Sequence, residues 1–241
     1  MALGDRRYMS QTQTQAGAAQ LDEGLRKYML GVYNYMALGV AFTGVVALLV
    51  AMQPALLEAI ALSSFRWVLF GGILLLGFVA PRIMMTGSMA MAHGAFWVYD
   101  ALWGALMSPM FLLYTGDSMI RVFFITAATF AGVSLYGYTT KRNLAPLGAF
   151  FAMATIGILI ALLVNIFFLQ SGLFHLGLSI VVVLVFSGLT AYETQMIKNM
   201  YYAGDSGEVA ARKSIFGAFA LYGSFVTLFI WLLSIFGVAR E

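Results

Sequence analysis

The sequence contains no cysteine and little charge, since Asp, Glu, Lys and Arg make up only 10% of its 241 residues. Without cysteine, a disulfide framework, a thiolate metal site and a cysteine nucleophile are all excluded. The low charge argues against a soluble domain, in which about a quarter of the residues are charged. With 62% hydrophobic residues, the chain has more apolar surface than a soluble fold of this length can bury, and lipid is the solvent that suits it.

Residues that carry chemistry are also scarce. The two histidines, His93 and His175, lie far apart, and no His-Glu-x-x-His motif or glycine-rich phosphate loop is present. The chain is therefore not expected to be an enzyme or to hold a resident cofactor. The net charge of +3 includes no dense basic run, so nucleic acid is not an expected partner.

Long apolar runs separated by short polar loops fill most of the chain. A membrane-spanning helix needs ~20 apolar residues. A β-barrel would need alternating polar positions, and runs such as residues 180–186 do not alternate. We therefore predict an all-α, polytopic membrane protein, a bundle of seven transmembrane helices, with Gln53-Pro54 and Pro81-Arg82 ending the first two runs. The predicted spans are residues 28–51, 64–82, 95–114, 119–139, 145–169, 173–200 and 215–238.

The chain divides into a polar N-terminal tail, residues 1–27, and a seven-helix transmembrane domain, residues 28–241. We expect the tail to be disordered, with an interfacial helix over residues 21–28. Lys and Arg in short loops favour the cytoplasmic side, and this rule predicts a cytoplasmic N-terminus and an outside C-terminus. Ten of the 13 basic residues then lie inside: Arg6, Arg7, Arg26, Lys27, Arg82, Lys141, Arg142, Lys198, Arg212 and Lys213.

Two carboxylates inside apolar runs are the first candidates for a functional site. Asp100 lies in the third predicted span and Glu193 lies late in the sixth. An ionised group at a helix centre costs ~2.5–3.5 kcal/mol on insertion scales. With an inside N-terminus, both acids fall in the cytoplasmic half, as does Arg82. One interpretation is a cluster that binds a cation or titrates with pH; the other is a structural ion pair, or side chains that reach the interface.

The chemistry of such a cluster is simple. A Glu–Arg contact that breaks when the acid is protonated would act as a pH gate. Calcium prefers several oxygen ligands. Glu193 and Asp100 with Asn34, Thr190 or Thr194 would provide a weak, transient calcium site and not a tight one.

Several stretches of the sequence resemble the bacterial Bax inhibitor-1 family. The resemblance runs from about Phe96 to Gly237. Its motifs occur in the family's order: residues 121–132 (RVFFITAATFAG), 134–142 (SLYGYTTKR), 191–197 (AYETQMI), 221–222 (LY) and 232–237 (LLSIFG).

The resemblance implies a fold with one central helix surrounded by six others, in the bacterial inner membrane. It also implies a function, because family members are associated with a pH-sensitive calcium leak and, in eukaryotes, with suppression of stress or cell death. Some bacterial relatives instead modulate a membrane-bound ATP-dependent protease.

The family's sensor is a pair of aspartates on the last two spans, engaged by an arginine of the second span. This sequence departs from that pattern twice. Glu193 replaces the sixth-span aspartate, and Ser224 replaces the seventh-span aspartate. Arg82 would be the arginine. Asp100 is a candidate for a compensating acid on the strength of this sequence alone.

Three hypotheses follow. The first is a cation leak or sensor that uses Glu193, Arg82 and Asp100, with calcium ions as cargo. The second is an interaction protein that modulates a membrane protease through its N-terminal tail and transports nothing. The third is a homologue that kept the fold after losing the paired-acid function.

Overall fold

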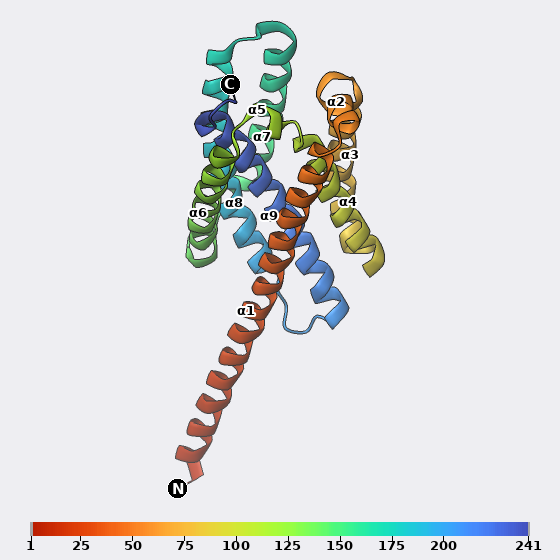
Figure 1. The fold of residues 1–241 in the computed structure, drawn as a ribbon. Helices are drawn as coiled ribbons and strands as arrows, with labels where there is room; N and C mark the ends of the chain where they lie inside the picture. The colour runs from red at the N-terminus through yellow and green to blue at the C-terminus, as the bar shows by residue number, and fades with distance from the viewer. Residues whose placement is uncertain (1, 241) are drawn as a thin grey trace.

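In lipid, backbone polar groups must be satisfied within the chain, and helices satisfy them. The computed structural model describes residues 2–240, with side chains from Glu23 onward, and it contains no strand in that range (Figure 1). An isolated bridge joins Tyr114 to Ala239. The helices are α1 (Ala2–Ala51), α2 (Pro54–Leu62), α3 (Phe65–Thr86), α4 (Met89–Met107), α5 (Met110–Leu113), α6 (Gly116–Thr139), α7 (Leu147–Val164) with a π-helical turn (Asn165–Leu169), α8 (Gly172–Asn199) and α9 (Gly207–Phe236).

Seven of these segments are long and apolar enough to cross a membrane, which confirms the predicted number of spans. They are Glu23–Ala51, Phe65–Thr86, Met89–Leu113, Gly116–Thr139, Leu147–Leu169, Gly172–Asn199 and Gly207–Phe236. The first ends before Gln53-Pro54, as predicted.

Pro81 does not end the second span, and that prediction was wrong. Helix α3 continues through Pro81 to Thr86. A proline removes only one backbone donor, and membrane helices tolerate it where neighbouring helices support the chain. Here α3 packs along α4. The short helix α2, whose first residue is Pro54, was not predicted.

The N-terminal tail is helical where the sequence analysis expected disorder. Helix α1 begins at Ala2 and extends well beyond the rest of the bundle (Figure 1). Its first part is rich in alanine and glutamine and contains no proline, and this composition permits a helix. The boundary between tail and membrane domain at residues 27 and 28 stays a prediction.

Helix α9 is the central helix of the bundle. It packs against α1, α3, α4, α6 and α8. In the most apolar stretch of α9, 56% of the residues are buried, against 6% in the corresponding stretch of the span that contains α7. Helix α7 packs mainly on α8, so it lies at the periphery. The expected central helix is thus the last one, and its side chains meet most other helices.

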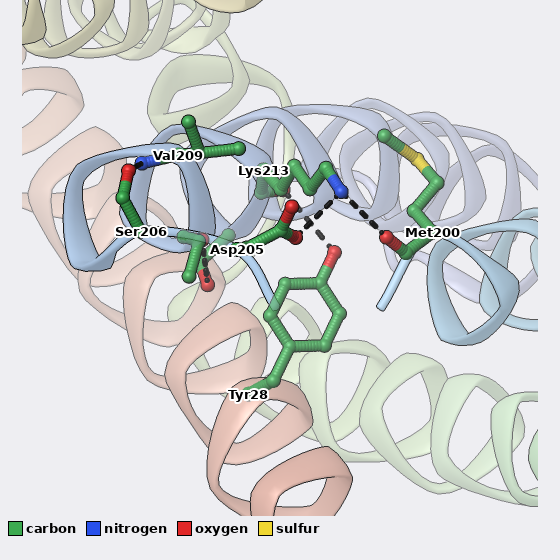
Figure 2. Close-up of polar contacts among 8 residues, drawn as sticks. Tyr28, Met200, Asp205, Ser206, Val209 and Lys213 are labelled. Carbon is green, nitrogen blue, oxygen red and sulfur yellow. Dashed lines mark hydrogen bonds and ion pairs between the residues drawn. The ribbon is translucent and has the colours of Figure 1, made fainter. Parts of the chain in front are cut away.

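At the end of the bundle where α1 enters, the turn between α8 and α9 is held by Lys213. Its Nζ lies 2.6 Å from Asp205 Oδ2 and donates to the carbonyl of Met200 at 2.9 Å (Figure 2). The Tyr28 hydroxyl of α1 lies 3.5 Å from the Lys213 carbonyl. The Ser206 hydroxyl caps α9 by accepting from Val209 N. We call this end, which also carries Arg26 and Lys198, the basic end.

Helices α6 and α8 approach closely at one glycine. A methyl group on Gly137 would lie 2.2 Å from the Ala191 carbonyl oxygen, whereas one on Gly132 of the same helix would meet nothing within 4 Å. Small residues let helix backbones approach in membranes, and Gly137 does so here.

Gly137→Ala is therefore expected to destabilise the protein by about 1–3 kcal/mol, because backbone atoms of α8 cannot yield as a side chain would. Gly132→Ala is the matched control. It should be neutral or slightly stabilising, since alanine favours a helix over glycine. Thermal unfolding in detergent measures both. Equal unfolding temperatures for the two variants would contradict the close approach.

Candidate functional site

Glu193 of α8 and Ser224 of α9 form the central contact of the candidate site. The Ser224 hydroxyl donates to Glu193 Oε2 at 2.6 Å, and Ser224 is buried. A hydroxyl that donates to a carboxylate makes a strong, short hydrogen bond when the acid is ionised. Serine can donate this bond to the ionised acid, whereas a second carboxylate at the same place would need a shared proton.

The two residues that follow Glu193 hold the end of α8 to other elements. Thr194 Oγ1 lies 2.9 Å from Ser134 Oγ of α6. Gln195 donates to the Arg142 carbonyl and accepts from the Leu144 backbone amide, at 2.8 and 2.7 Å. The motif that includes Glu193 is thus fixed to α6 and to the loop after α6, and this fixes the direction of the Glu193 side chain toward α9.

Glu193 and Ser224 line a cavity of about 750 Å³ whose walls come from α3, α4, α7, α8 and α9. Most of its lining is apolar, and the cavity separates α3 from α8. A second polar pair lines the same cavity, where His175 Nε2 lies 3.0 Å from Ser234 Oγ and the imidazole packs on Trp231. His175 falls within the predicted sixth span, residues 173–200, but the sequence did not identify this pair.

Asp100 lies elsewhere, among α1, α4 and α9. It is fully buried, and neither carboxylate oxygen has a hydrogen-bond partner. Its Oδ2 sits so close to Gly39 that a methyl group there would be 2.6 Å away. Asp100 does not line the cavity that contains Glu193.

A short hydrogen-bond chain runs beside Asp100. The Thr43 hydroxyl donates to the Asp100 carbonyl at 3.1 Å and lies 2.6 Å from the Tyr222 hydroxyl. Because Thr43 has only one proton, Tyr222 is the donor to Thr43. The hydrogen-bond chain was not predicted, although Tyr222 belongs to the Leu221-Tyr222 motif of the family resemblance.

The three charged residues of the expected cluster are not brought together. Arg82 is exposed, and the one ion pair among the described side chains joins Lys213 to Asp205. Residues two apart on a helix face different sides. Ser224 therefore faces Glu193, whereas Tyr222 faces the region of Asp100 on another side of α9.

The oxygen ligands expected for calcium are not assembled either. Thr190 and Thr194 donate to carbonyls of their own helix at 2.7 and 2.8 Å, and Asn34 is exposed. Within the described residues, no group of three His, Asp or Glu side chains is placed to hold a metal ion. Sequence spacing could not show this, because it does not fix the rotation of each helix.

Comparison with known proteins gives consistent matches over almost the whole chain. The family model described as inhibitor of apoptosis-promoting Bax1 matches residues 25–241. An uncharacterized protein of Rickettsia prowazekii is 42% identical over 91% of this chain and 93% of its own length. Inner membrane protein YbhL of Escherichia coli K12 is 40% identical over 90% and 94%. An uncharacterized membrane protein of Streptococcus pyogenes is 33% identical over 90% and 95%.

The unpartnered state of Asp100 has a measurable consequence. Asp100→Asn is expected to stabilise the protein in detergent at pH 8 by about 1–3 kcal/mol, because the folded wild type must either bury an uncompensated charge or protonate the acid, and asparagine requires neither. A higher unfolding temperature than wild type measures this gain. Asp117→Asn, at an exposed site in the first turn of α6, is the control and should cost at most about 1 kcal/mol. A lower unfolding temperature for Asp100→Asn would mean that the carboxylate has a stabilising partner.

Proposed function

Because the chain belongs to the Bax inhibitor-1 family, we propose that it is an inner-membrane cation leak, with calcium as cargo, gated by the protonation of Glu193. One observation carries the proposal: a half-buried acid lines a cavity in the membrane domain, and its hydrogen bond comes from a neutral serine. The inner membrane is the location named for the Escherichia coli relative. The basic residues favour a cytoplasmic N-terminus.

In this mechanism, the ionised Glu193 pairs with Arg82 when the gate is closed, and protonation of Glu193 breaks that pair and opens the cavity to cations. Ser224 keeps the carboxylate pointed at α9 and can donate to it in the ionised form. Because one acid titrates in place of two, opening the gate involves one proton, so the calcium flux changes only gradually with pH.

Arg82 takes part through movement of α3. Pro81 lines the same cavity as Glu193, and Arg82 is the next residue along the helix. Closing α3 toward α8 would bring the guanidinium toward the ionised acid, and an Arg–carboxylate pair would hold the closed state. The exposed Arg82 then belongs to the open state, and Asp100 stays a second acid on the other side of α9.

The first test is calcium flux into proteoliposomes. The wild-type flux is expected to change between about pH 8 and pH 6, and Glu193→Gln should remove that change because its side chain does not titrate. Glu208→Gln, at an exposed position on α9, is the matched control and should behave as wild type. Identical pH profiles for Glu193→Gln and wild type would end the gate proposal.

Ser224→Asp provides a gain-of-function comparison. It restores the carboxylate pair of the family pattern beside Glu193, and like charges in contact compete for a proton. The expected result is a steeper pH dependence of calcium flux than in wild type. A flux profile unchanged from wild type would show that position 224 does not contribute to gating.

A second candidate function is modulation of a membrane-bound ATP-dependent protease without transport. The observation that favours it is the projection of α1 beyond the bundle, which offers a helix for a partner to contact (Figure 1). The family resemblance supplies the class of partner. This function requires the tail and does not require Glu193, so the two candidates separate experimentally.

Deletion of residues 2–22 should abolish co-purification with the membrane-bound protease while the membrane domain keeps its unfolding temperature. The span that begins at Glu23 stays intact in this variant. Glu193→Gln is the control and should co-purify normally. Unchanged co-purification after the deletion would refute the tail as the contact.

A further inference from the structure

A groove opens between α1 and α6 near the basic end of the bundle. Its volume is about 590 Å³, within the range of small-molecule sites. Arg26 lies on its α1 wall and Tyr138 on its α6 wall, with Tyr33 and Phe130 further along. Helices α1 and α6 run in opposite directions. Arg26 of α1 and Tyr138, near the end of α6, therefore lie at the same end of the groove. The groove is distinct from the cavity that contains Glu193.

Two of the hydroxyls that line this groove, those of Tyr33 and Ser134, are already satisfied. The Tyr33 hydroxyl lies 2.6 Å from Ser134 Oγ, which lies 2.9 Å from Thr194 Oγ1, and Thr194 donates to the Thr190 carbonyl. Since each hydroxyl has one proton, the donors run from Tyr33 through Ser134 to Thr194. The Tyr33 and Ser134 hydroxyls therefore direct no free proton into the groove, and an apolar chain is the occupant that suits the stretch between them and Phe130.

The mouth of the groove is positive. Arg26 is exposed there. Lys198 Nζ donates to the Tyr138 carbonyl at 2.8 Å and lies 5.1 Å from the centre of the Tyr138 ring. Lys141 and Arg142 follow directly after α6. The lining includes no acidic residue. Basic pockets between transmembrane helices bind anionic lipid headgroups.

From this charge and apolar depth we propose that the groove binds one anionic phospholipid from the leaflet at the basic end. The phosphate contacts Arg26 at the mouth. One acyl chain lies between α1 and α6, over Tyr33 and Phe130. The proposal concerns a lipid site on the outer face of the bundle and does not depend on cation transport.

The test is native mass spectrometry of the full chain in detergent, with phosphatidylglycerol, phosphatidylcholine and glycerol 3-phosphate as probes. Phosphatidylglycerol should bind about fivefold more tightly than phosphatidylcholine, the factor that about 1 kcal/mol per basic residue provides. Arg26→Gln should remove that preference. Arg66→Gln, on an exposed arginine in the first turn of α3 and outside the groove, is the matched control and should keep it.

Two further results complete the test. Ala131→Phe places a ring in the groove and should weaken both lipids several-fold with the unfolding temperature unchanged. Equal affinity for the two lipids, or equal loss with Arg26→Gln and Arg66→Gln, would overturn the proposal. Binding of glycerol 3-phosphate as tight as that of phosphatidylglycerol would also overturn it, because the groove would then contribute nothing.

Discussion

Hydrocarbon does not tolerate a polar group without a partner, and this constraint organises the bundle. Most buried serine and threonine hydroxyls donate to a carbonyl three or four residues earlier in the chain, as Ser118 and Thr126 do. The few that bond across helices are therefore informative. They join α1 to α9 through Thr43, and α6 to α8 through Ser134. The third, Ser224, joins α9 to the one acid of the cavity.

The central position of α9 follows from the same constraint. Its side chains at positions 222 and 224 point to different sides of the helix, and each makes a hydrogen bond to a different helix. A rotation of α9 would therefore disturb both contacts at once. Tyr99 packs on Tyr222 with ring centres 5.9 Å apart and also lines the cavity of Glu193, so an aromatic ring connects the two sides.

Much of the fold was predictable because the length of an apolar run and its flanking loops decide where a helix crosses. The number of spans depends on nothing else. Pro81 misled the prediction because support from α4 is a tertiary effect. The candidate site was harder. Glu193 was identified from its cost in hydrocarbon, but its partner and the exposure of Arg82 depend on helix rotation, which one sequence does not determine.

Among the described residues, Asp100 is the acid that departs from this rule. Its carboxylate is buried without a partner, against the bare backbone of Gly39 and beside a tyrosine that bonds to Thr43 instead. An apolar residue of similar size would make this interface more stable. Retained charge in a membrane core is a sign of function by default. The Thr43 hydroxyl links the backbone of Asp100 to Tyr222, so this carboxylate lies where α1, α4 and α9 meet, and any change in their packing would change its surroundings.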